Sequence, residues 1–395
     1  MDKLHNPFSP GAGTPPPELA GRDNILNRAL LTLARIKRGR AEKSILIIGL
    51  RGTGKTVLLY EISKLAENEN YQTAMIEAHE KKSLPELLLP ELRRILFSLD
   101  TEEKISDKVK KAFRVLKSFV SSIKFNTKIQ EIDFGMSIEP QRGIADSGDL
   151  ESDLAQVFIA IGEAAKDRNT AVAIIIDELQ YLTEEELSSL IMSVHKLSQK
   201  SLPVVLIGAG LPQLVGKAGR AKSYAERLFD YPELGPLKKE DAKIALQAPV
   251  ERENVSFSDD ALNEIIRVTE GYPYFLQEWG YQAWNIATQS PIGIEVARKA
   301  TDLSIKQLDQ NFFRVRFDRL TPREKEYLRA LAELGTKPQK SGNVADKLGL
   351  DVKNAAPLRN NLIKKGMIYS PKHGDTAFTV PLFEGFMKRI MPREL

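Results

Sequence analysis

The stretch that decides the fold is SILIIGLRGTGKTVLL, residues 44–59. Its four apolar residues at 45–48 predict a buried parallel strand. Residues 49–56, GLRGTGKT, match the pattern G-x-x-x-x-G-K-[ST] in full. Apolar residues at helical spacing start at Val57. A strand, a glycine-rich loop and a helix in this order are the context in which such a loop binds phosphate groups.

Each position of this loop has a chemical reason. Gly49, Gly52 and Gly54 lack a Cβ, so that backbone N–H groups can approach a triphosphate closely. Lys55 begins the helix and is predicted to reach the β- and γ-phosphates, while the Thr56 hydroxyl binds Mg²⁺. The alternative, a glycine-rich turn that happens to hold a lysine, does not account for the flanking strand and helix. The other predicted nucleotide contacts are Arg51, Thr53 and Val57.

A second apolar run, AVAIII at 171–176, ends in the carboxylates Asp177 and Glu178. The carboxyl end of a central parallel strand faces the ligand site of an open α/β sheet. Asp177 is therefore predicted to hold Mg²⁺, directly or through water, and Glu178 to orient and deprotonate an attacking water. The alternative is a buried strand that simply ends in a polar turn.

The composition of the chain limits the classes of protein to which it can belong. A chain of 395 residues with 42% hydrophobic residues suits two or three globular domains. It has no cysteine, which excludes disulfides and thiolate chemistry, and only four histidines. No apolar run approaches the roughly 20 residues of a membrane span, and the polar, Pro- and Gly-rich start does not resemble a signal peptide. We therefore expect a cytoplasmic protein without a membrane partner.

The sequence predicts a P-loop α/β core with a helical lid and a C-terminal winged helix-turn-helix. The expected divisions are an extended lead-in at 1–17, the core at 18–235, the lid at 236–310, a linker at 311–320 and the winged helix at 321–395. A hairpin-like insertion is expected at about 123–148. Asp23 is expected to cap the first helix, and Thr321-Pro322-Arg323-Glu324 predicts a capping box.

The ordered motifs resemble those of AAA+ and STAND-type ATPases, most of all the origin-recognition and archaeal-type group. The entry at 19–23, LAGRD, is similar to a box near the adenine in that group. The resemblance implies ATP as ligand, a nucleotide-dependent homo-oligomer, and a role for Arg227 at a neighbouring subunit's nucleotide. A surface salt bridge is the alternative for Arg227. The group's polar sensor is missing, because Gly208-Ala209-Gly210 stands at the end of the third strand.

The lid carries Glu270-Gly271-Tyr272-Pro273-Tyr274 where the initiator group places a sensing arginine. This segment resembles the Gly-x-Pro element of STAND ATPases, which implies that Pro273 contacts the nucleotide. A helix start with proline near its first position explains the same residues. Trp279 and Trp284 are expected to pack in the core.

The last 75 residues are basic. From Thr321 to Leu395, 14 Lys and Arg face 8 Asp and Glu, a balance of +6 in a chain of net charge +4. A basic module on a nearly neutral body favours a polyanionic partner. In a winged helix the third helix and the wing would present a set of polar side chains to duplex DNA, namely Lys353, Asn354, Arg359, Asn360, Lys364 and Lys372.

Three functions are compatible with these features. The first is a Mg²⁺-dependent ATPase that hydrolyses ATP and acts on DNA through a conformational switch. The second is a STAND-like signalling or oligomerising ATPase whose winged helix binds protein. The third is a nucleotide-gated scaffold with negligible turnover.

Overall fold

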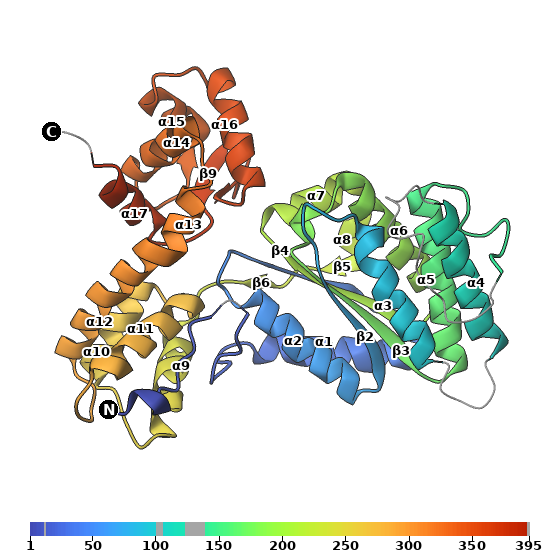
Figure 1. Ribbon diagram of the computed structural model, residues 1–395, viewed down its shortest axis with the longest axis horizontal. Coiled ribbons are helices and arrows are strands. Elements are labelled where there is room, and N and C mark those ends of the chain that lie inside the picture. Colours follow the sequence, from blue (N-terminus) through green and yellow to red (C-terminus); the bar gives the residue numbers. More distant parts are fainter. Residues whose placement is uncertain (12, 100–105, 123–138, 393–395) are drawn as a thin grey trace. The chain divides into compact units, whose positions relative to one another are not determined.

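The computed structural model describes residues 1–11, 13–99, 106–122 and 139–392 (Figure 1). The chain divides into two compact units. The first combines residues 1–21, 50–54 and 235–395, and the second combines residues 22–49 and 55–234. The division falls inside the glycine-rich loop, so Leu50–Gly54 belongs with the first unit and Lys55 begins a helix of the second.

The second unit is built on a parallel sheet of six strands in the order β2-β3-β4-β1-β5, with β6 also paired to β1. The predicted fold class, an α/β core on a parallel sheet, is confirmed. The strands are β1 (Ser44–Gly49), β2 (Tyr71–Glu77), β3 (Ala171–Asp177), β4 (Val204–Gly210), β5 (Phe229–Asp230) and β6 (Glu233–Leu234).

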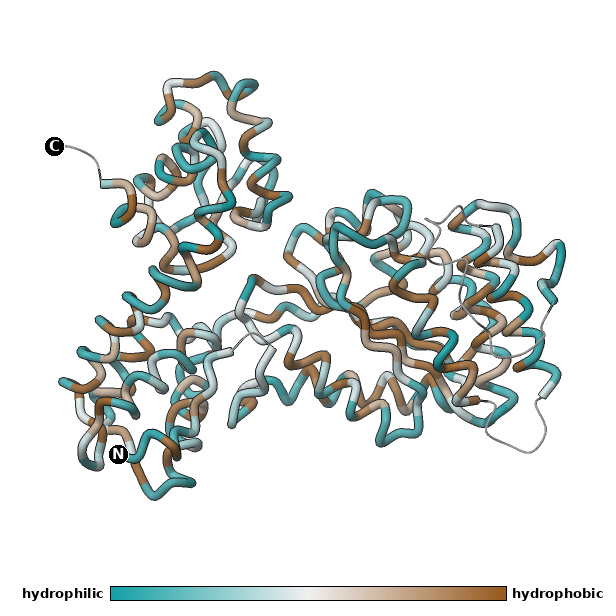
Figure 2. Tube along the Cα trace, in the orientation of Figure 1, coloured by the Kyte–Doolittle hydropathy of each residue, from teal (hydrophilic) through white to brown (hydrophobic). Residues whose placement is uncertain are grey.

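Alternate strand residues supply two hydrophobic cores, because successive side chains point to opposite faces of a sheet. Ile174 packs in the core under α3 (Leu84–Ser98), α5 (Leu150–Asp167) and α6 (Glu184–Gln199). Ile175 packs in the core under α1 (Asp23–Lys37) and α2 (Lys55–Asn68). Both faces are covered, which explains why β3 is apolar at every position up to Asp177 rather than alternating. Figure 2 shows these strands as the brown centre of the unit, with teal on the outer helices.

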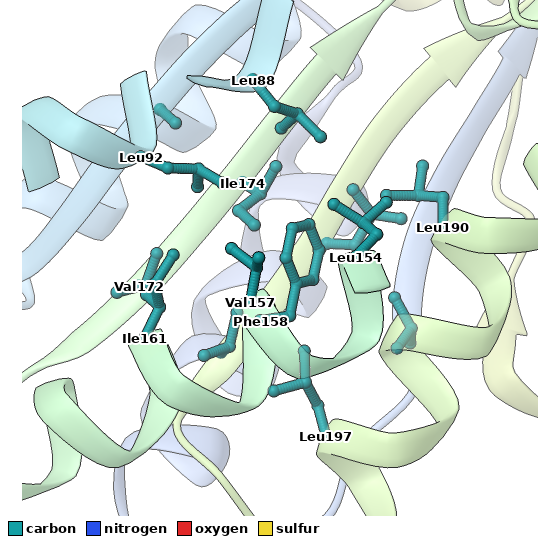
Figure 3. Packing of buried hydrophobic residues seen from close by; sticks show 14 of the residues in the cluster. Leu88, Leu92, Leu154, Val157, Phe158, Ile161, Val172, Ile174, Leu190 and Leu197 are labelled. Carbon is teal, nitrogen blue, oxygen red and sulfur yellow. The ribbon is translucent and has the colours of Figure 1, made fainter. Parts of the chain in front are cut away.

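The close packing of the larger core is visible in Figure 3. This core combines Phe158 and Leu154 of α5 with Ile174 of β3. Leu88 of α3 and Leu190 of α6 belong to the same core. Burying one such side chain contributes about 1.5–3 kcal/mol. The helices of this unit are α1 (Asp23–Lys37), α2 (Lys55–Asn68), α3 (Leu84–Ser98), α4 (Asp107–Ser122), α5 (Leu150–Asp167), the 3₁₀ turn η2 (Leu179–Tyr181), α6 (Glu184–Gln199), α7 (Gln213–Ala221) and α8 (Ala225–Leu228).

Two expectations for this unit need correction or restriction. Asp23 does not cap α1: Arg22 holds the cap position without a side-chain cap bond, and Asp23 is the first helical residue. Its charge still suits the positive end of the helix dipole. Of the predicted insertion, residues 123–138 lie outside the described residues, and 139–149 contain turns and bends without a strand.

The lid helices of the first unit are α9 (Lys239–Glu251), α10 (Asp259–Thr269), α11 (Pro273–Ile286) and α12 (Ile294–Gln307). The predicted linker at 311–320 is mostly helical, because α12 runs on through a π-helical turn, η3 (Leu308–Phe313), into α13 (Arg314–Phe317). Phe313 and Phe317 of this segment pack on Phe386 of the tail, with ring centroids 5.4 and 5.7 Å apart. The aromatic residues therefore anchor the tail.

The predicted lead-in packs on the lid. It holds one 3₁₀ turn, η1 (Lys3–His5), and Phe8 is 2% exposed. A Cβ on Gly280 of α11 would lie only 2.6 Å from the Phe8 ring. Trp284 donates its indole N–H to the Asp2 carbonyl at 2.8 Å, and Trp279 is fully buried. The packing role predicted for both tryptophans is confirmed.

The tail consists of α14 (Pro322–Glu333), β7 (Gln339–Lys340), α15 (Ser341–Lys347), α16 (Val352–Lys364), β8 (Ile368–Tyr369), β9 (Asp375–Phe378) and α17 (Phe383–Ile390). Its strands form an antiparallel sheet in the order β7-β9-β8. The Thr321 capping box at the start of α14 is confirmed, with Glu324 bonded back to the cap. Among the described residues, no helix has the length and hydropathy to cross a membrane.

Candidate nucleotide site

The second unit brings together four of the predicted site residues. Lys55 and Thr56 open α2, while Asp177 ends β3 and Glu178 follows it. The Thr56 hydroxyl donates to Asp177 Oδ2 at 2.5 Å, across 121 positions of sequence. Lys55 is 6% exposed and Asp177 3%. A lysine and a carboxylate buried this deeply in one small region are expected only where they compensate each other or serve a ligand.

The electrostatics of Asp177 follow from this burial. Burial raises the pKa of Asp177 above its ordinary value, and the charge of Glu178 acts in the same direction. The Thr56 hydroxyl, the Glu178 amide and the Lys55 ammonium lower this pKa but do not outweigh burial. A carboxylate whose pKa remains raised by burial is stabilised by a nearby cation.

Glu178 has an unusual backbone. Its φ of 55° and ψ of 36° place it in the left-handed region, and its N–H donates to Asp177 Oδ1 at 2.8 Å. For a residue other than glycine this conformation is uncommon and costs free energy. Such strain is typical of functional sites, where the surrounding structure holds a side chain in one direction.

The part of the loop that belongs to the first unit, Leu50–Gly54, has positive φ angles at its two glycines. Gly52 and Gly54 have φ of 80° and 91°, which glycine adopts without penalty. Thr53 is 1% exposed, and its hydroxyl donates to the Leu50 carbonyl at 2.9 Å. Gly49 instead ends β1 and pairs with Leu234 of β6. Val57 is buried in α2.

Within the first unit, the loop lies against the start of α11. The Tyr272 hydroxyl donates to the Arg51 carbonyl, and the Tyr274 amide donates to the Gly52 carbonyl at 3.3 Å. A Cβ on Gly52 would come within 3.0 Å of the Tyr272 ring. Pro273 occupies the first turn of α11, between these two tyrosines. The helix-start interpretation of Pro273 is confirmed, and its contact with nucleotide stays a prediction.

Two predicted site residues have surroundings that the sequence did not indicate. The Arg51 guanidinium lies beside Gly366 of the tail, since a Cβ there would be 2.6 Å from Arg51 Nη2. Arg227 lies in α8 with its side chain exposed, and it makes no ion pair in the described part of the chain. The salt bridge considered for Arg227 is therefore not formed there.

The six polar residues predicted to face DNA divide into two groups. Lys353, Asn354, Asn360 and Lys364 are exposed on α16, and Lys372 is exposed between β8 and β9. Arg359 is different, because it donates to the Thr376 hydroxyl at 2.9 Å and to the Asp375 carbonyl at 2.8 Å. Its guanidinium holds α16 to β9, and its contact with DNA stays a prediction.

Sequence reasoning missed two residues near Glu178. The Gln180 side chain donates to Glu178 Oε2, and Lys217 of α7 donates to the carbonyls of Gln180 and Leu182. Only the order Asp-Glu-Leu-Gln in the sequence could have drawn attention to Gln180. No group of three or more His, Cys, Asp or Glu residues suited to a metal ion is found among the residues described.

Comparisons with known proteins agree with this geometry. Residues 18–207 match a family model described as an AAA ATPase domain, which confirms the predicted resemblance. Residues 310–387 match a second model, described as a domain of unknown function. The search of curated proteins finds no match.

Three solved structures are similar over nearly the whole chain. A Walker-type ATPase of Pyrococcus abyssi has 18% identity and a TM-score of 0.58, covering 95% of this chain and 98% of that chain. The Orc1 protein of Aeropyrum pernix in complex with DNA has 15% identity and a TM-score of 0.47, covering 94% of this chain and 93% of that chain. Cdc6p from Pyrobaculum aerophilum has 16% identity and a TM-score of 0.47, covering 99% of this chain and 98% of that chain. The first similarity shows that this chain shares the fold of the Pyrococcus abyssi protein.

Proposed function

We propose that this chain, which carries an AAA ATPase domain at residues 18–207, binds ATP with Mg²⁺, hydrolyses it, and uses the cycle as a conformational switch on duplex DNA. The observation that carries the proposal is the pairing of Thr56 with Asp177 beside the buried Lys55. These are the three side chains that a P-loop ATPase needs for metal and phosphate.

The oxygen atoms of Thr56 and Asp177 fit a magnesium ion. Mg²⁺ prefers oxygen ligands, is commonly held by one or two protein groups, and keeps several waters. A hydroxyl and a buried carboxylate within 2.5 Å of each other form such a pair. When bound, the ion would neutralise charge that develops on the β- and γ-phosphates.

The proposed roles of the other residues follow from charge and position. Lys55 binds the β- and γ-phosphates, and the amides between Gly49 and Thr56 surround them. Glu178 takes a proton from the attacking water as the water oxygen bonds to the γ-phosphorus. The bond from that phosphorus to the β–γ bridging oxygen breaks, which gives ADP and inorganic phosphate. Arg227 is proposed to complete a neighbouring subunit's site in an ATP-dependent homo-oligomer.

Binding of ATP by calorimetry, in the presence of Mg²⁺, tests the proposal. Lys55→Ala should reduce ATP affinity at least about 100-fold, since it removes the buried charge that faces the phosphates. Lys64→Ala is the matched control, because Lys64 lies on the same helix, is 62% exposed and pairs with Glu61. Equal affinities for wild type and Lys55→Ala would overturn the proposal.

The DNA part rests on charge in the tail. Lys353, Lys364 and Lys372 are exposed, and each stands without an ion-pair partner among the residues that the structure describes. Unpaired cations spaced over one helix and the following turn suit contacts with phosphates. In the alternative function, the same tail binds a protein and the ATPase is a signalling switch. Salt-insensitive binding or no binding to duplex DNA would favour that alternative.

A further inference from the structure

Gln180 connects Glu178 to the end of the neighbouring strand. It lies in η2, two residues after Glu178, and its amide Nε2 donates to Glu178 Oε2. Its Oε1 accepts the backbone N–H of Leu211, the residue after β4, at 3.1 Å. The Gln180 side-chain amide thus donates to the proposed general base. It also accepts from the backbone at the end of β4, 31 residues away in the sequence.

The sequence at the end of β4 makes room for this connection. A Cβ on Gly210 would lie 3.0 Å from Gln180 Oε1, and a Cβ on Gly208 would lie 2.2 Å from Leu179 Cδ1. A Cβ at position 208 would force the Leu179 side chain to shift, and a Cβ at position 210 would press on Leu214 Cδ2, at 2.8 Å, as well as on the Gln180 amide. The segment Gly208-Ala209-Gly210 therefore has no polar side chain of its own, and Gln180 supplies the polar group there.

The backbone of the same turn is held from α7. Lys217 Nζ donates to the Gln180 carbonyl at 3.2 Å and also to the Leu182 carbonyl. Burial lowers the pKa of Lys217, against the opposing charges of Glu184 and Glu186. Both the side chain and the main chain of Gln180 are thus bonded to the segment that follows β4. A shift of that segment would be passed to the Glu178 carboxylate.

We propose that Gln180 is a positioning residue for hydrolysis, whose amide fixes the Glu178 carboxylate relative to the end of β4. The inference rests on the proposed function and adds a residue to it. Gln180 does not touch the reacting atoms in this role. It limits the directions that the Glu178 carboxylate can take, and a misplaced base is costly because proton transfer needs close, aligned groups.

Gln180→Glu is the most informative variant. It keeps the shape of the side chain and the acceptor for Leu211, but it replaces the N–H donor by an oxygen that repels Glu178. We expect kcat for ATP hydrolysis to fall about 10- to 100-fold, with the KM for ATP and the melting temperature nearly unchanged. Gln199→Glu is the control, because it makes the same chemical change at the exposed end of α6.

Two further variants keep the test decisive if Gln180→Glu does not fold. Gly210→Ala presses on Leu214 and on the Gln180 amide without changing charge, and Gly219→Ala on α7 has no atom within 4 Å of the new Cβ. We expect the first to lower kcat and the second to leave it unchanged. Normal kcat in folded Gln180→Glu or Gly210→Ala protein, or a change in KM alone, would overturn the inference while leaving the ATPase intact. Absence of turnover in the wild type would refute the proposed hydrolysis itself.

Discussion

The carboxyl end of β3 and the outer face of α16 use charge in opposite ways. At β3, Asp177 is buried and bonded to Thr56 and to the Glu178 amide. On α16, Lys353 and Lys364 are exposed and form no ion pair in the described part of the chain. Desolvated charges are costly unless something compensates them, whereas exposed charges cost little and act through long-range attraction. This difference is why we propose chemistry on one ligand for the first region and contacts with an extended polyanion for the second.

The sharpest test of the β3 side of this comparison is Glu178→Gln. It removes the proposed base and keeps the size of the side chain, so turnover should fall about 10³-fold while ATP still binds with nearly wild-type affinity. Steady-state kinetics and calorimetry on the same preparation measure the two effects. Glu184→Gln, at the exposed start of α6, is the control. Unchanged turnover in Glu178→Gln would remove Glu178 from the mechanism.

Arg227 tests whether an exposed charge can contribute to ATP hydrolysis. Arg227→Ala should reduce turnover about 100-fold in the assembled protein, as loss of an electrostatic donor does, and should not affect a monomer. Turnover measured across protein concentration, with mass determined by light scattering, separates the two states. Arg220→Ala on α7 is the control, since Arg220 is exposed and paired with Glu184. Equal loss in a verified monomer would contradict a role in trans.

Sequence reasoning reached the parts of the site that are local in the chain. The loop at 49–56 is followed directly by its helix, and the run ending at Asp177 is a strand by hydrophobicity alone. Both patterns are read from neighbouring residues, and both were found in the structure. The parallel sheet followed from the same signals, because fully apolar strands separated by helices require cover on both faces.

What sequence reasoning missed depends on contacts between distant segments. The bond from Leu211 to Gln180 joins two turns that only the pairing of β3 with β4 brings together. Arg359 was assigned to DNA from its place on α16, and no local pattern around it indicates its bonds to β9. Phe8 fits against Gly280 because that helix residue has no side chain, which no local pattern around Phe8 indicates.

The tail also has a buried charge, Glu324, which sharpens the comparison. Its carboxylate is 3% exposed, closes the Thr321 capping box and accepts from Lys365 Nζ at 2.7 Å. Burial acts to raise the pKa of Glu324, but the bonds from Lys365 and the Thr321 amide outweigh it, so the net shift is downward. Glu324→Gln should destabilise the protein by about 2 kcal/mol.

The pH dependence of that loss has a definite sign. A carboxyl whose pKa is lowered by folding stabilises the protein above its unfolded pKa of about 4.3. The stabilisation is lost as pH falls through the lower folded value. Urea unfolding should therefore show the full difference between wild type and Glu324→Gln at pH 7 and a shrinking one below about pH 4. Glu326→Gln, exposed on the same helix, is the control, and a pH-independent difference would contradict the assignment.

The smallest expected effects belong to the exposed lysines. Lys353→Ala, Lys364→Ala and Lys372→Ala should each weaken binding to duplex DNA about three- to fivefold and reduce the slope of log affinity against log salt by about 1. Each loss should be similar on unrelated DNA sequences, since phosphate contacts carry no sequence information. Lys388→Ala, exposed on α17 of the same tail, is the control. If the three variants and the control bind DNA alike, the exposed lysines do not contact DNA. The outer face of α16 is then a solvated helix surface, and only the end of β3 is a binding site.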